Sequence, residues 1–71
     1  MSARDLTRRE FDRACARAGF RPVGFLGFYL LAPPVDNVST SVLNAGPRLR
    51  DQLAYLHRQQ AIFEKRALEG K

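Results

Sequence analysis

Apolar side chains between positions 11 and 18 recur at intervals of three and four residues, which predicts the core-facing stripe of a helix. The stripe consists of Phe11, Ala14, Cys15 and Ala18. Thr7 is suited to cap the start of this helix, and Glu10 three residues later completes a capping box. Gly19 tolerates the positive φ that ends a helix, and Phe20 is expected to fold back onto the last turn. The pattern therefore predicts a first helix between Thr7 and Gly19.

The period changes after residues 21–22. Residues 25–31 form a run of aromatic and aliphatic side chains that is too short for a helix and has proline on both sides, so it predicts a strand. Residues 32–37 are rich in proline, aspartate and asparagine, which favour a turn. Residues 38–43 then alternate in the manner of a half-exposed strand. Together these segments predict an antiparallel hairpin.

A second, longer helix is predicted for the C-terminal third. Gly46 is acceptable as its N-cap and Pro47 is favoured in its first turn, and the helix is expected to continue to about Glu69. Gln60 interrupts its apolar seam, which is formed by Leu49, Leu53, Leu56 and Phe63. At roughly 33 Å this helix is longer than the strands, so its C-terminal half is expected to extend past the core. The sequence predicts one α+β domain over residues 1–71, in the order α-β-β-α.

The predicted strand 25–31 is apolar on both faces, whereas two helices can cover only one face of a two-stranded sheet. We therefore expect a partner to cover the other face or to pair with the sheet edge. The partner is either a second copy, which would give a homodimer with a four-stranded sheet, or a different protein. The alternative is a monomer in which a twisted hairpin hides this surface. The candidate protein-interaction residues are Phe25, Tyr29, Tyr55, Ile62 and Phe63.

Charge adds a second hypothesis. Twelve Lys and Arg against seven Asp and Glu give a net charge of +5, and only Asp36 is charged within residues 22–47. Arginines at positions 9, 13 and 17 line up opposite the apolar stripe of the first helix, which is typical either of a nucleic-acid contact or of a solvated helix face. The start of the second helix could bind a phosphate through free N–H groups, with ordinary capping as the alternative. The candidate residues for nucleic acid or an acidic partner are Arg9, Arg13, Arg17, Arg48 and Arg50.

No residue pattern indicates catalysis, and we predict that the chain is not an enzyme and needs no cofactor or metal. The lone Cys15 excludes an internal disulfide and is expected to fill the core, and His57 has no second histidine with which to bind a metal. Ser39 and Ser41 have no general base nearby in the sequence. A free cysteine without a secretory signal indicates the cytoplasm, and no stretch is long and apolar enough to span a membrane.

Two segments, residues 41–47 and 50–56, resemble parts of small uncharacterised accessory proteins of bacteriophages and prophages. The resemblance covers roughly a third of the chain and carries no functional motif, so it assigns no site residue. It implies a phage accessory protein in the host cytoplasm that inhibits or redirects host machinery, including a nuclease complex of the CRISPR type. The sequence therefore predicts a non-catalytic protein-binding module of anti-CRISPR-like character. The alternative is a basic nucleic-acid-binding protein that uses the arginines of the first helix.

Overall fold

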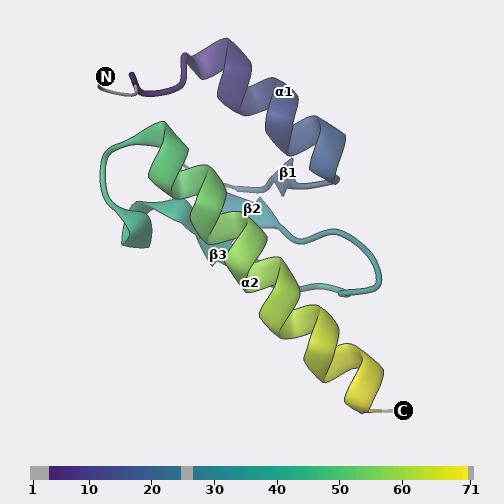
Figure 1. Cartoon of the computed structure of the whole chain (residues 1–71). Coiled ribbons are helices and arrows are strands. Elements are labelled where there is room, and N and C mark those ends of the chain that lie inside the picture. Colours follow the sequence, from purple (N-terminus) through teal and green to yellow (C-terminus); the bar gives the residue numbers. More distant parts are fainter. Residues whose placement is uncertain (1–3, 25–26, 71) are drawn as a thin grey trace.

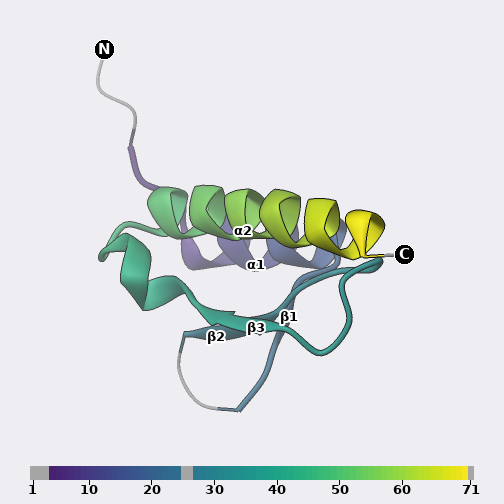
Figure 2. The same cartoon turned by 90° about the horizontal axis from the view of Figure 1, so that it is seen from below.

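The computed structural model describes residues 4–24 and 27–70 of the chain. Two helices lie side by side over one face of a three-stranded antiparallel sheet with the strand order β1-β2-β3 (Figures 1 and 2). The elements are α1 (Arg8–Ala18), β1 (Arg21–Pro22), β2 (Phe28–Leu30), β3 (Ser39–Ser41), the 3-10 helix η1 (Val42–Ala45) and α2 (Leu49–Glu69). The predicted α+β class and the order of helix, strands and helix are confirmed.

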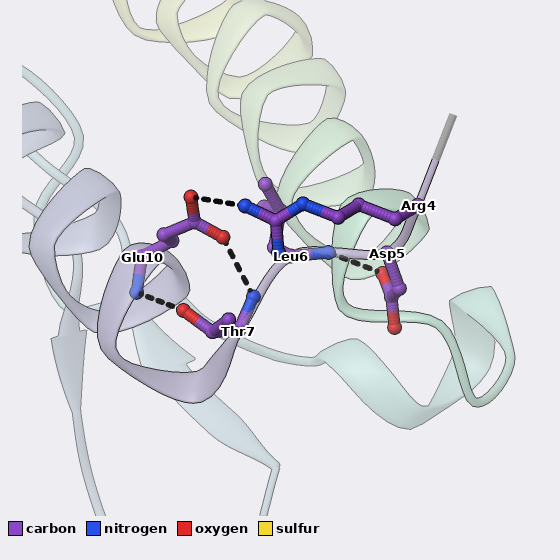
Figure 3. Close-up of polar contacts among 5 residues, drawn as sticks. All are labelled: Arg4, Asp5, Leu6, Thr7 and Glu10. Carbon is purple, nitrogen blue, oxygen red and sulfur yellow. Dashed lines mark hydrogen bonds and ion pairs between the residues drawn. The ribbon is translucent and has the colours of Figure 1, made fainter. Parts of the chain in front are cut away.

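Both ends of α1 follow the local sequence signals. The Glu10 N–H donates to the Thr7 hydroxyl at 3.1 Å, and the Thr7 N–H donates to the Glu10 carboxylate at 2.8 Å, which completes the predicted capping box (Figure 3). At the other end Gly19 has a φ of 92°, and the Phe20 N–H donates to the Cys15 carbonyl at 2.9 Å. The predicted helix is therefore confirmed at both ends.

The sheet has one strand more than predicted, and its strands are shorter. Arg21 pairs with Leu30 and forms part of β1, which the sequence pattern did not indicate. The predicted strand 25–31 contains β2, but Gly27 takes a φ of 85° and bends the chain just before it. After β3 the backbone turns into η1, where the Ser41 hydroxyl accepts a hydrogen bond from the Leu43 N–H at 3.3 Å. The bend at Gly27 therefore limits β2 at its start, and the cap at Ser41 ends β3.

The core lies between the helices and the sheet. Phe11 of α1 and Leu56 of α2 are both fully buried, and the Phe11 ring meets the edge of the Tyr29 ring with centroids 5.8 Å apart. The buried cluster consists of Phe11, Cys15, Phe20, Tyr29, Leu31, Val35, Val42 and Leu56. Each helix thus buries one face against the same side of the sheet.

The second helix begins two residues later than predicted, because Gly46 ends η1 with a φ of 96° and Arg48 becomes the N-cap of α2. Gln60, which interrupts the apolar seam, has a structural role. Its side-chain carbonyl accepts from the Ala32 N–H at 2.8 Å, and its amide donates to the Ala32 carbonyl at 2.8 Å. The buried Gln60 therefore joins α2 to the loop between β2 and β3. Further along, Leu68 is 64% exposed, so the end of α2 extends beyond the core (Figure 1).

Within the described residues neither helix combines the length and the apolar character that a membrane-spanning segment requires.

Candidate protein interface

The face of the sheet that points away from the helices is the first candidate surface. Successive side chains of a strand point to opposite faces, so Tyr29 points toward the helices while Phe28 and Leu30 point away from them. Both helices lie on the other side of the sheet (Figure 2). Phe28 is 45% exposed and Leu30 is half-buried. We call this surface the outer face. It is formed by Phe28 and Leu30 of β2, together with Arg21, which pairs with Leu30 from β1.

The position of Tyr29 differs from the prediction that it lies at a protein interface. Only 4% of its surface is exposed, and its hydroxyl accepts a hydrogen bond from the Arg8 guanidinium at 3.2 Å. Burial raises the pKa of this hydroxyl above its ordinary value. The sequence pattern could not identify Phe28 as the outward residue, because the phase of a strand depends on which face its partners cover. Phe25, the other predicted residue of this strand, lies outside the described residues.

Two predicted residues of α2, Tyr55 and Ile62, lie on one side of the helix because they are seven positions apart. The Tyr55 hydroxyl accepts from the Thr40 hydroxyl at 3.1 Å and from the Asn44 amide at 3.5 Å, and these bonds lower the pKa of Tyr55. Ile62 is 41% exposed. Phe63, in contrast, is half-buried and packs against the core. The structure therefore places Tyr55 beside β3, with Ile62 about two turns further along the same side of α2, and packs Phe63 against the core.

We define the β3 flank as the surface formed by β3 and by the face of α2 that carries Tyr55. On α2 it comprises Asp51, Tyr55, Arg58 and Ile62, at successive spacings of four, three and four residues. A cavity of about 350 Å³ opens beside it, between η1 and α2. The cavity is lined by Asn44, Ala45, Asp51, Ala54, Tyr55 and Arg58. The flank thus combines apolar, charged and hydrogen-bonding groups at the surface.

The predicted arginine row, Arg9, Arg13 and Arg17, is exposed along α1. None of the three forms an ion pair with any residue in the described part of the chain. Their neighbour Arg8 differs, since it pairs with Asp12 at 3.2 Å. The row is therefore an exposed strip of positive charge on the opposite side of α1 from the core, although Arg13 is near enough to Glu10 to help lower the pKa of that carboxyl.

The start of α2 is occupied by a side chain of the same protein. The Asp5 carboxylate accepts hydrogen bonds from the Leu49 N–H at 3.0 Å and the Arg50 N–H at 2.8 Å, and from the Leu6 N–H at 2.9 Å (Figure 3 shows the last bond). The backbone bonds from Arg50 and Leu49, with the nearby charge of Arg48, lower the pKa of Asp5. The hypothesis of a free phosphate site here is therefore wrong, and Arg48 and Arg50, both exposed, flank a capped helix start.

Two of the residues considered for catalysis, Cys15 and His57, pack against other side chains of the fold. Cys15 is 3% exposed, which confirms it as a core residue, and burial raises the pKa of its thiol to about 11. The exposed His57 packs its ring against the edge of Phe20 with centroids 5.2 Å apart. Over residues 4–24 and 27–70 no three His, Cys, Asp or Glu side chains come together as they would to bind a metal. A buried thiol with so high a pKa is a poor nucleophile.

Comparisons with protein-family models, with curated proteins and with solved structures found no match. The described residues form three surfaces that are suited to contact with a partner: the outer face, the β3 flank and the arginine row. The first two carry exposed apolar side chains, and the third carries charge alone.

Proposed function

We propose that the chain is a non-catalytic protein-binding module whose contact surface is the outer face of its sheet. The observation that supports this function is Phe28, a large aromatic side chain that is 45% exposed on β2, on the face that neither helix covers. Since Phe28 is 45% exposed, a partner that covers it would contribute roughly half of the about 1.5–3 kcal/mol that full burial of such a side chain provides. Aromatic residues on rigid elements are also the usual anchors of protein interfaces.

The residues around Phe28 are suited to an interface. Leu30 extends the apolar surface along the strand, and Arg21 stands opposite Leu30 on β1, where a cationic rim would lie. Ser39 and Ser41 are opposite Leu30 and Phe28 on β3, so the surface becomes polar toward that strand. An apolar centre with a polar rim is the composition of a contact that forms between separately folded proteins.

The resemblance of residues 41–47 and 50–56 to phage accessory segments suggests the class of partner. An accessory protein of a phage would bind a component of the host machinery and inhibit or redirect it, in the manner of an anti-CRISPR protein. The basic charge of this chain favours a partner with an acidic surface, because opposite potentials accelerate association.

Nucleic-acid binding is the second candidate function, and the arginine row supports it. Three exposed arginines without an ion pair in the described chain could contact successive phosphates. Such binding would weaken steeply as salt is raised, in proportion to the number of phosphates contacted. It would leave Phe28 without a role.

Photo-crosslinking separates the two functions. A photoreactive phenylalanine analogue is placed at Phe28, at Arg13 or, as a control, at the exposed loop residue Asp36, and each variant is irradiated in bacterial cells. Binding through the outer face predicts a discrete protein adduct from position 28 that positions 13 and 36 do not give. Nucleic-acid adducts from position 13, with none of protein from position 28, would support the second function and contradict the first.

A further inference from the structure

The strand β3 is an edge strand of the sheet. Some of its backbone N–H and C=O groups point away from β2, where another strand could pair with them. The Leu31 N–H donates to the Val38 carbonyl at 3.0 Å, and bonded pairs alternate along an antiparallel ladder. Thr40 therefore bonds to β2, whereas the N–H and C=O groups of Ser39 and Ser41 point away from it. Apart from the Ser41 carbonyl, which as the N-cap of η1 accepts the first bond of that helix, these groups bond to no described residue on that side. An exposed strand edge of this kind is a template for pairing with a further strand.

The edge is complementary to itself. A two-fold rotation about an axis at Thr40 places Ser39 of one copy opposite Ser41 of the other, and Ser41 opposite Ser39. In each pair the Ser41 N–H can donate to the Ser39 carbonyl, and the Ser39 N–H can donate to the Ser41 carbonyl, whose second lone pair remains beside the bond that begins η1. A second copy thus offers a partner to each outward N–H group of β3.

Helix α2 carries charges that the same rotation brings together. The Tyr55 hydroxyl lies 3.1 Å from that of Thr40, so Tyr55 is held close to the axis. Asp51 lies about one turn before Tyr55 and Arg58 about one turn after it, on the same side of α2. Rotation makes the two helices antiparallel and sets Asp51 of each copy opposite Arg58 of the other. Neither residue forms an ion pair within the described chain.

We propose that a second copy of the chain binds at the β3 flank and forms a dimer with a continuous six-stranded sheet. A three-residue strand pair alone would bury little area, but the row from Asp51 to Ile62 extends the contact over about 17 Å of each helix. The exposed Ile62 supplies apolar area to this contact. The arginine row lies on α1, away from the flank, so the largest repulsive charges stay apart (Figure 1). The proposal concerns the sheet edge, and it does not depend on binding at the outer face.

Charge reversal tests this arrangement because the geometry predicts a rescue. The dissociation constant of the dimer is measured by sedimentation for the wild-type chain and for Asp51→Arg, Arg58→Asp and the double variant. Each single reversal sets like charges opposite one another twice, so we expect dimerisation to weaken about tenfold or more. The double variant restores both attractive pairs and should return to within about threefold of the wild type. An equimolar mixture of the two single variants should form a heterodimer.

Net charge cannot produce this pattern, since Asp51→Arg makes the chain more basic and Arg58→Asp makes it less basic, yet both should weaken the dimer. Arg13→Asp changes the charge as Arg58→Asp does, but on α1, and should leave the dimer intact. A chain that stays monomeric up to about 1 mM overturns the proposal. So does a dimer that ignores both reversals, that fails to recover in the double variant, or that Arg13→Asp weakens as much as Arg58→Asp does. Circular dichroism confirms that each variant is folded.

Discussion

The α1 side and the β3 side of this small domain differ in how their polar groups are satisfied. On the α1 side the chain supplies partners for its helix starts and its buried hydroxyl, since Glu10 caps α1, Asp5 caps α2, and Arg8 bonds to the buried Tyr29, while the arginine row faces solvent. On the β3 side an edge strand has outward backbone groups, Ile62 is 41% exposed, and Asp51 and Arg58 of α2 form no ion pair within the described chain. The first side therefore contributes to folding, whereas the second is available for binding.

This difference has a consequence for mutations. Changes on the α1 side or in the core should lower the free energy of unfolding, while changes on the β3 flank should alter association and leave the folded chain almost unaffected. A domain of this size has a free energy of unfolding of only a few kcal/mol. A core mutation therefore unfolds a large fraction of the chain, whereas a surface mutation on the β3 flank does not.

The largest effect is expected for Phe11→Ala. Phe11 is fully buried and packs against Tyr29, so its removal should cost about 3–5 kcal/mol and leave the domain largely unfolded at 37 °C. Ile62→Ala on the exposed flank should cost less than about 1 kcal/mol. Urea unfolding measures the cost for Ile62→Ala, and the loss of the folded circular dichroism signal without urea shows that for Phe11→Ala. Similar losses would remove the distinction between the two sides.

The next largest effect is expected at the buried hydrogen bonds between Gln60 and the backbone of Ala32. Gln60→Leu leaves the N–H and C=O of Ala32 without a partner in a buried place, so we expect a loss of about 2–4 kcal/mol in the free energy of unfolding. Gln59→Leu is the matched control on the same helix and should be nearly neutral. Thermal and urea unfolding measure both. If Gln60→Leu were neutral, Gln60 would not hold the β2–β3 loop against α2.

A smaller effect is expected at the end of α1. Gly19→Ala combines an unfavourable φ of 92° with a contact of 2.9 Å between the new Cβ and the Cβ of Ala32, and should cost about 1–3 kcal/mol. Gly24 also has a positive φ, but a Cβ there has no atom within 4 Å. Gly24→Ala should therefore cost less, and the difference between the two variants measures the close packing of α1 on the loop. Equal costs would show that this packing is loose.

The smallest effect depends on pH. Because hydrogen bonds lower the pKa of Asp5 in the folded chain, its carboxylate stabilises the fold above its ordinary pKa of 3.8, and this contribution is lost as pH falls through the lowered pKa. Asp5→Asn should be less stable than the wild type at neutral pH, and the gap should close in acid. Glu10 also has a lowered pKa, so Glu10→Gln separates its contribution. A gap that persists in acid would contradict the role of the Asp5 charge.

The sequence predicted what is local and missed what is distant. The capping box of α1 and its glycine end depend on residues within a few positions of one another, and both were found. The Asp5 cap joins residues 44 positions apart, and no spacing rule connects them. The inward position of Tyr29 and the short β1 depend on strand register, which the hydrophobic run 25–31 does not encode because it is apolar at nearly every position. Of the predicted interface residues, Tyr55 and Ile62 lie together because helical spacing already placed them on one side.

Amide hydrogen exchange of β3, followed residue by residue by NMR at low and high protein concentration, tests the binding role of this side most directly. In a dimer the N–H groups of Ser39 and Ser41 donate across the new interface, so their exchange should slow markedly as concentration rises. The Thr40 N–H bonds to β2 within one chain and should be protected at both concentrations. Fast exchange of Ser39 and Ser41 at every concentration, beside a protected Thr40, would show that no second copy pairs with this edge.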